Sequence, residues 1–345
     1  DLLYTNYFYR SNISNTMNRD LRDVVSESIN RVKLKYGDNV LDVGCNDGLM
    51  LTFYPDNLKR FGIDPAGNID WGHLDKSITI VNDYFPSKQL ENKKFKIITS
   101  TAMFYDLDNP NESVGQLKRI LDKDGVVCIQ VSYLYDTIRD MNFYDICHEH
   151  LEYYSLKTLS YLLEKNGLSI FDASTNAVNG GSLRVYATHK EAKRVKSENL
   201  EYLLLKEKVL QLENPETYDT FSKLIKLSGE KVKKFIQAQK GLVIGLGAST
   251  KGNVLLQICG IDKKILPYIS ERNPIKFGLR TLGTDMELIS EEEARAKNPA
   301  CVFVIPWNFK AEIVDREKEY IQKGGKMLFI MPYPYYVDKN GEHKL

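Results

Sequence analysis

Short apolar runs, each followed by polar residues, recur along the first half of the chain. They are "NVLDVG" (39–44), "RFGIDP" (60–65), "ITIVND" (78–83), "FKIITS" (95–100) and "GVVCIQVS" (125–132). Their length and content favour buried strands, and the segments around them, such as 20–35 and 110–122, have helical spacing. Strands that alternate with helices predict a parallel sheet covered by helices on both faces.

The pattern continues with apolar runs at 168–174 and 182–189, joined by a turn at Gly180–Gly181. Residues 198–240 then change to helical spacing, with a break at Pro215. A second strand–turn–helix unit begins at 241–260, "GLVIGLGASTKGNVLLQICG", and strand-like runs follow it at 264–270, 301–306 and 326–331. The predicted fold class is α/β, with one Rossmann-like domain and a second, smaller Rossmann-like C-terminal domain.

These patterns predict four parts of the chain. Residues 1–36 are a leading segment and helix, and residues 37–190 are the first α/β domain. Residues 191–240 are a helical connector, and residues 241–345 are the C-terminal domain. A chain of 345 residues is long enough for two such domains.

The charge balance argues against two classes of partner. Lys plus Arg total 47 and Asp plus Glu total 46, so a net charge of +1 predicts neither nucleic-acid nor membrane-surface binding. No apolar run approaches the roughly 18 residues of a membrane span. Five scattered cysteines without a C-x-x-C pair argue against disulfides and structural zinc. We therefore expect a reducing, cytoplasmic location and no metal.

The first strand ends in "LDVGCNDG", a glycine turn that leads toward a helix. Gly44 and Gly48 let a cofactor approach the backbone, but their G-x-x-x-G spacing differs from the dinucleotide motif. S-adenosylmethionine has no pyrophosphate, and Asp42 can face its ammonium group. Asp64 ends the second strand, where it can accept from ribose hydroxyls, and Asp83 ends the third, near the adenine. The turn with its acids predicts S-adenosylmethionine as cofactor.

The stretch "YDICHEHLEYYS" (144–155) holds two of the five histidines. One interpretation is a metal site. The stretch lacks the i,i+4 histidine spacing of a helical metal-binding motif, and the sequence shows no clear further cluster of ligands. A nucleophilic Cys147 and a purely structural capping role are two other interpretations. We favour a histidine general base oriented by a carboxylate, with tyrosines that stabilise an oxygen gaining negative charge. These groups suit enolisation beside a ketone.

Several motifs in one order resemble a known family. "HEHLEYYS", "GGSLRV", "GASTKGN" and "PWNF" are similar to the sugar C-methyltransferases, which methylate a carbon next to the keto group of a nucleotide-linked deoxysugar. The resemblance runs from "YFYRS" (7–11) to "MPYP" (331–334). It implies a class I methyltransferase domain, a Rossmann-like C-terminal domain, and a nucleotide-linked keto-sugar as substrate between them.

The resemblance also implies roles for individual residues. His150 is the base, with Glu149 and His148 beside it, Tyr7 or Tyr9 reaches the sugar, and Tyr153 is a further catalytic candidate. The expected donor contacts are Asp42, Gly44, Cys45, Asn46, Gly48, Asp64, Pro65, Asp83 and Ser100. The expected substrate contacts are Cys147, Lys251, Gly252, Asn253, Trp307 and Asn308. Trp307 either stacks on the nucleotide or sugar or packs in the core.

The sequence departs from the family in three places. The usual N-terminal four-cysteine zinc module does not occur in this sequence. Cys147 stands where members carry tyrosine, which leaves Tyr144, Tyr153 or Tyr154 to donate to the enolate oxygen. The segment "TAMFYDLDNP" (101–110) lacks a histidine found in members, so a second base is absent.

The expected function is therefore S-adenosylmethionine-dependent C-methylation of a nucleotide-linked keto-sugar. One alternative is a sugar O-methyltransferase, which needs the base but no ketone. Another is an NAD(P)-dependent oxidoreductase that uses the "GLGASTKG" loop, with Glu271 as the ribose-binding acid. A third is a catalytically inactive sugar-nucleotide binding module. The oligomeric state is left open.

Overall fold

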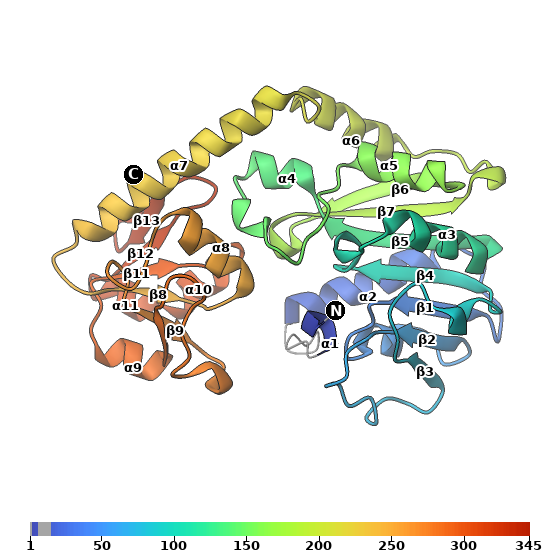
Figure 1. Ribbon diagram of the computed structural model, residues 1–345, viewed down its shortest axis with the longest axis horizontal. Coiled ribbons are helices and arrows are strands. Elements are labelled where there is room, and N and C mark those ends of the chain that lie inside the picture. Colours follow the sequence, from blue (N-terminus) through green and yellow to red (C-terminus); the bar gives the residue numbers. More distant parts are fainter. Residues whose placement is uncertain (1, 6–14) are drawn as a thin grey trace. The chain divides into compact units, whose positions relative to one another are not determined.

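Two units, each with its own sheet, make up the protein. The structure is a computed structural model that describes residues 2–5 and 15–345 (Figure 1). The first unit extends to Leu134 and resumes over Leu151–Val209, and the second comprises Tyr135–His150 and Leu210–Leu345. The predicted α/β fold class, with a sheet in each half of the chain, is confirmed.

The first sheet has the strand order β3-β2-β1-β4-β5-β7-β6. Its strands are β1 (Asn39–Val43), β2 (Lys59–Ile63), β3 (Ile78–Val81), β4 (Phe95–Thr101), β5 (Leu121–Ser132), β6 (Leu168–Asn176) and β7 (Ser182–His189). Each apolar run predicted as a strand in this half of the chain forms one. β1 to β5 are parallel, whereas β7 pairs antiparallel with β5 and β6. The turn from Asn176 to Ser182 is too short for a parallel crossover.

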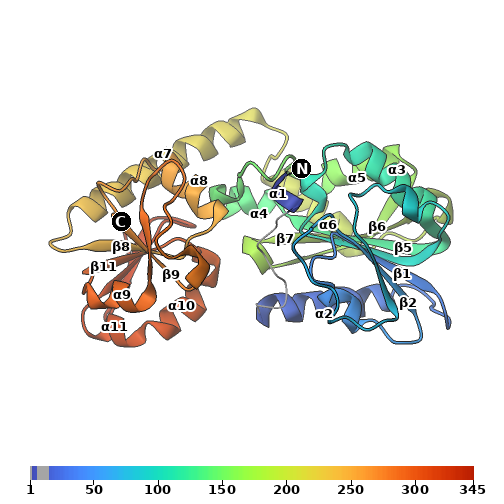
Figure 2. The ribbon, with the colours of Figure 1, turned by 60° about the horizontal axis from the view of Figure 1, so that its bottom comes forward.

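Helices cover both faces of this sheet. They are α2 (Asn15–Ile29), α3 (Pro110–Ile120), α5 (Leu156–Lys165) and α6 (Glu198–Val209), with the single turn α1 (Leu2–Thr5) before them. Figure 2 shows α2 on one face and α3 and α5 on the other. Leu21, Val24 and Val25 of α2 pack against Val40 and Ile97 of the strands. The helix predicted over residues 20–35 therefore begins earlier, at Asn15, and ends before residue 35, at Ile29.

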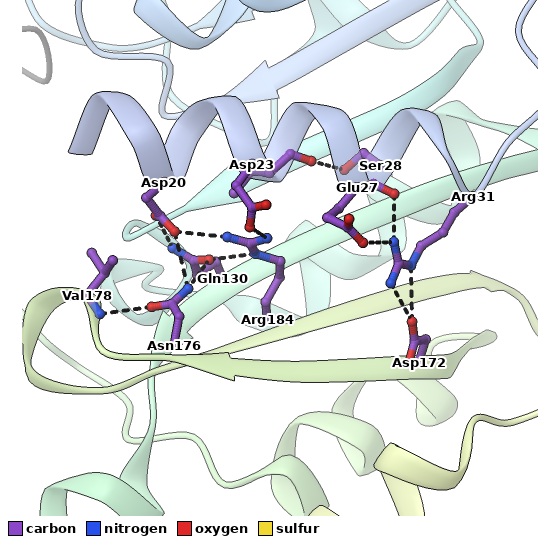
Figure 3. A network of polar contacts seen from close by, with 11 residues as sticks. Asp20, Asp23, Glu27, Ser28, Arg31, Gln130, Asp172, Asn176, Val178 and Arg184 are labelled. Carbon is purple, nitrogen blue, oxygen red and sulfur yellow. Dashed lines mark hydrogen bonds and ion pairs between the residues drawn. The ribbon is translucent and has the colours of Figure 1, made fainter. Parts of the chain in front are cut away.

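A buried polar network holds α2 against strands β5, β6 and β7 (Figure 3). The guanidinium of Arg184 donates to Gln130 Oε1 at 2.7 Å, to Asp20 Oδ1 at 2.9 Å and to Asp23 Oδ2 at 2.6 Å. Gln130 Nε2 and Asn176 Nδ2 donate to the same Asp20 carboxylate, at 2.6 and 3.2 Å. Arg184 belongs to the "GGSLRV" motif, so one role of this motif is to attach α2.

The second sheet has the order β10-β9-β8-β11-β12-β13-β14. Its strands are β8 (Val243–Leu246), β9 (Tyr268–Glu271), β10 (Glu287–Ser290), β11 (Cys301–Val304), β12 (Lys326–Phe329), β13 (Tyr335–Asp338) and β14 (Gly341–Lys344). β8 to β12 are parallel, and the last two strands form an antiparallel edge. β9 starts later than the predicted run at 264–270, since Pro267 has no N–H for the ladder.

Helices also cover both faces of the second sheet. They are α7 (Pro215–Gln237), α8 (Thr250–Ile258), α9 (Glu291–Ala296), α10 (Lys310–Arg316) and α11 (Lys318–Gln322), and the chain enters this unit through α4 (Leu134–Arg139). Side chains alternate between faces: Phe303 packs with α7 and α8, whereas Val302 and Val304 pack with α9, α10 and α11. α7 begins at the predicted break, with Asn214 as its N-cap and Pro215 in its first turn.

Candidate functional site

The turn after β1 is shaped by left-handed backbone conformations. Gly44, Asn46 and Gly48 have φ values of 74°, 49° and 77°. A Cβ on Gly44 would lie 2.8 Å from Met103 Cγ, and one on Gly48 would lie 2.6 Å from Leu74 Cδ1. Both positions therefore require glycine, for backbone conformation and for space. Gly44 N and the neighbouring Cys45 N donate to Ile63 O, which joins the turn to β2.

The acid at the end of β2 closes this turn. Asp64 Oδ2 accepts from Asn46 N at 2.8 Å, and Oδ1 accepts from Ala66 N at 3.0 Å, beyond Pro65. Trp71 Nε1 donates to Asn46 O at 2.8 Å, and Asn82 Nδ2 donates to Asp64 O at 2.9 Å. The structure therefore brings Gly44, Asn46 and Asp64 together at one turn, and their contact with the methyl donor stays a prediction. Trp71 and Asn82 were not predicted, because they lie outside any motif.

Carboxylates concentrate around the same turn. Asp42 is buried beneath it, and its Oδ1 accepts from Thr99 Oγ1 at 2.8 Å. Burial raises the pKa of Asp42 to about 7, and the negative charges of Asp64 and Asp47 contribute to the shift. A cation placed at this turn would offset that repulsion. A positively charged ligand is therefore favoured here on electrostatic grounds.

Two further predicted donor contacts differ in their availability. Ser100 lies beside Val43 of β1, and its buried Oγ has no hydrogen-bond partner among the residues that the structure describes. Such an orphaned hydroxyl is available to a ligand. Asp83 instead accepts from Ser87 Oγ at 2.7 Å and Tyr84 N at 2.9 Å. The hydrogen bond from Ser87 lowers the pKa of Asp83. The Asp83 carboxylate therefore also stabilises the turn in which it lies.

The histidine-containing stretch lies in the second unit, although it follows β5 of the first in sequence. Phe143 and Tyr144 pack in the core of the second unit with residues of α7 and α8. Tyr144 Oη donates to Asn308 Oδ1 at 2.9 Å, and Trp307 Nε1 donates to Asn142 Oδ1 at 3.2 Å. The "PWNF" residues, which follow β11, thus hold this stretch in place at the carboxyl edge of the second sheet.

The two histidines of the stretch have different environments. The side chain of His148 is 74% exposed, and its Nδ1 lies 3.1 Å from Glu149 Oε2. The side chain of His150 is 7% exposed, and its Nδ1 lies 3.7 Å from Asp145 Oδ2. Burial lowers the pKa of His150, whereas the charge of Asp145 raises it. His150 is therefore the imidazole of the stretch that lies in a protected setting.

Lys251 connects the C-terminal glycine loop to this stretch. Its Nζ donates to Asp145 Oδ1, and it lies 5.6 Å from the Tyr144 ring centroid. Lys251 is in the first turn of α8, where Ser249 caps Gly252 N at 3.0 Å and Asn253 N donates to Ser249 O at 3.1 Å. The structure therefore brings the expected substrate contacts Lys251 and Asn308 next to the histidine stretch.

Other residues near the histidines are less available. Burial raises the pKa of the Cys147 thiol to about 12, which opposes the nucleophilic interpretation because the reactive form is the thiolate. At Leu151 the chain returns to the first unit, where Leu151 N and Glu152 N donate to Tyr105 O. Tyr153 and Tyr154 therefore belong to the other unit. Tyr7 and Tyr9 lie outside the described residues.

Glu271 is the acid expected to bind the ribose in the alternative nicotinamide-cofactor site. Glu271 ends β9, and its oxygens accept from Ala248 N at 3.1 Å and from Arg272 N and Asn273 N at 2.8 and 3.0 Å. Lys276 Nζ lies 3.5 Å from the same carboxylate. This acid fastens its own loop, as Asp64 does in the first unit. Geometry alone does not make the loop a redox-cofactor site.

Two family models match consecutive parts of the chain. Residues 17–172 match a methyltransferase domain, and residues 177–334 match the C-methyltransferase C-terminal domain. The chain is 27% identical over 343 residues to the C-methyltransferase NovU of Streptomyces niveus, covering 97% of this chain and 81% of that protein. The chain is a methyltransferase, and its C-terminal part is similar to the C-methyltransferase C-terminal domain.

Solved methyltransferase structures are similar to part of this methyltransferase. The plantazolicin methyltransferase BpumL in complex with SAH is 16% identical, with a TM-score of 0.41 over 52% of this chain and 88% of that chain. A TehB-like methyltransferase from Corynebacterium glutamicum is 16% identical, with a TM-score of 0.37 over 49% of this chain and 87% of that chain.

In the parts of the methyltransferase that the structure describes, no helix combines the length and apolarity needed to cross a membrane.

One residue of the site was missed by sequence reasoning. Asp145 is 1% exposed and lies between Lys251 and His150. The only signal was an acidic residue inside a stretch already selected for its histidines. The sequence placed Glu149 next to the base; its Oε2 lies 3.1 Å from Nδ1 of His148, and its charge raises the pKa of His150.

Proposed function

We propose that this methyltransferase transfers a methyl group from S-adenosylmethionine to a carbon beside the keto group of a nucleotide-linked sugar. His150 is the general base. The observation that carries this proposal is a buried histidine, anchored by the glycine loop and the "PWNF" residues of a C-methyltransferase C-terminal domain. Carbon acids need such a base, because the acceptor becomes nucleophilic only after it loses a proton.

The turn after β1 suits S-adenosylmethionine as methyl donor. Gly44 and Gly48 leave the space that a Cβ would fill, and Ser100 Oγ lacks a hydrogen-bond partner within the described residues. Asp42 and Asp64 supply negative charge for a ligand that carries sulfonium and ammonium groups. When bound, the donor supplies an electrophilic methyl group. The residues of the turn bind and orient it.

His150 carries out the proton transfer. Its ring accepts the proton from the carbon next to the ketone, and the electron pair of that C–H bond moves into the enolate. Of the three candidate tyrosines in the stretch, Tyr144 and Tyr154 are buried and Tyr153 is partly exposed. Tyr144 is the one of the three that belongs to the same unit as His150. After methyl transfer, His150 releases its proton to solvent.

The test separates donor binding, proton removal and methyl transfer. S-adenosylhomocysteine at 100 times its Kd should stabilise the protein against heat by about 2.7 kcal/mol, whereas NADH and NADP⁺ should not. A panel of nucleoside-diphosphate-linked keto-deoxysugars is then incubated in D₂O with the enzyme and S-adenosylhomocysteine. Exchange of the proton next to the ketone, followed by NMR, reports on the base without the methyl-transfer step.

Two histidine variants provide a matched pair. His150→Ala should lose about 10²–10⁴-fold in both proton exchange and methyl transfer while still binding S-adenosylhomocysteine. His148→Ala should stay close to wild type, because His148 is largely exposed. Near-normal exchange by His150→Ala would refute the base assignment. Methylation of a hydroxyl without proton exchange would instead show an O-methyltransferase.

A further inference from the structure

Asp145 lies close to His150. Its carboxylate Oδ2 is 3.7 Å from His150 Nδ1. The other carboxylate oxygen, Oδ1, accepts from Lys251 Nζ. Backbone turns reinforce the arrangement, since Cys147 N donates to Asp145 O at 3.0 Å and His150 N donates to Cys147 O at 3.2 Å.

Among the described residues, the Asp145 carboxylate has few polar contacts other than those with His150 and Lys251. It is 1% exposed, and Oδ2 makes no hydrogen bond among the described residues, although it faces the imidazole. A buried charge of this kind requires a partner, and Lys251 is the cation that supplies one. In catalytic sites, hydrogen bonds to a base are often long before substrate binds. A separation of 3.7 Å is compatible with that behaviour.

We propose that Asp145 is the positioning residue of the base: it holds Nδ1 of His150, and Lys251 fastens Asp145 from the opposite side. Once Nδ1 donates to Asp145, Nε2 of His150 is the atom that accepts the proton, because the hydrogen bond at one ring nitrogen decides the state of the other. The inference rests on the proposed function for its catalytic meaning. The geometric pairing of Asp145 with His150 does not depend on it.

The charged groups that face His150 act in opposite directions. Burial lowers the pKa of His150 most strongly; Asp145 raises it, Lys251 lowers it and Glu149 raises it. Removing Asp145 leaves Lys251 uncompensated, so the pKa of His150 should fall. Removing Lys251 leaves Asp145 uncompensated, so the pKa of His150 should rise. If Asp145 had only a structural role, substitutions of Asp145 and of Lys251 would not shift the pKa of His150 in opposite directions.

The experiment is an NMR titration of the full chain labelled with ¹³C at its histidine rings. The chain has five histidines, and the His150 signal is assigned by its loss in His150→Ala. Asp145→Asn should lower the His150 titration midpoint, and Lys251→Met should raise it, each on the order of 1 pH unit. Glu149→Gln should have a smaller effect, and the exposed Lys264→Met serves as the lysine control.

Activity gives the second readout. Asp145→Asn should lower kcat for proton exchange by less than the loss in His150→Ala, with KM close to wild type, and Asp145→Glu should recover part of it. Shifts of the His150 midpoint in the same direction in both Asp145→Asn and Lys251→Met, or no shift in either, would overturn the inference. Absence of turnover by wild type on every keto-sugar would instead count against the proposed function, and the titration would still decide the pairing.

Discussion

Replacing Arg184 with methionine should destabilise the first unit strongly. Arg184 is 3% exposed, and it is the cation paired with the buried Asp20. Its second ion pair, with Asp23, contributes little because the Asp23 side chain is 60% exposed. The loss therefore comes mainly from leaving Asp20 buried without its cation, and breaking such a pair costs about 3–5 kcal/mol.

Two amide groups reduce this cost. Gln130 Nε2 and Asn176 Nδ2 still donate to Asp20 in the variant, so we expect the lower end of the range, about 3 kcal/mol at pH 8. For a unit of this size, that loss corresponds to a Tm lower by about 6–12 °C. The assay is thermal unfolding by circular dichroism, with hydrogen exchange of β5, β6 and β7 to locate the change. The exposed Arg272→Met is the matched control.

The loss should also depend on pH. Burial already raises the pKa of Asp20 above its usual 3.8, and Arg184 opposes that rise. Without Arg184 the folded state binds the Asp20 proton still more tightly, so stability falls further as pH rises above the unfolded pKa. The deficit should be larger at pH 8 than at pH 5, and Asp20→Asn should partly relieve it. An equal loss at both pH values, or a shift no larger than that of Arg272→Met, would refute the reasoning.

The donor turn provides two further predictions. Gly44→Ala should weaken S-adenosylhomocysteine binding at least tenfold by calorimetry, since the new Cβ meets Met103 in a left-handed backbone; that is about 1.4 kcal/mol. Gly37→Ala, with φ of 79° and no atom within 4 Å of its Cβ, should leave the affinity unchanged; equal losses would contradict the steric argument. Affinity for the cationic donor should rise from pH 6 to pH 7.5 as Asp42 ionises, because its pKa is about 7. Asp42→Asn should remove this dependence of affinity on pH. If the affinity of Asp42→Asn still rose with pH, a group other than Asp42 would be responsible.

Strands buried on both faces were readable from the sequence, whereas edge strands were not. β1, β4 and the apolar part of β5 (125–132) were predicted from their apolar runs, although β5 itself begins earlier, at Leu121. β13 (Tyr335–Asp338) and β14 (Gly341–Lys344) form an edge hairpin in which β14 is largely polar and exposed, and β10 (Glu287–Ser290) was not predicted either. Such strands take their stability from pairing with neighbours, and the chain's local pattern carries little of that information.

The sequence by itself determined the α/β class and the glycine turn after β1 with its closing acid Asp64, and it predicted the histidine stretch as the place of chemistry. Local backbone demands and continuous apolar runs produce the first two signals. Only the tertiary structure assigned that stretch to the second unit and Asp145 to His150. The contacts that decide this, Asp145–Lys251 and Tyr144–Asn308, join residues 106 and 164 positions apart. Pairings at such separations arise from packing and charge compensation in the folded chain, which no local pattern records.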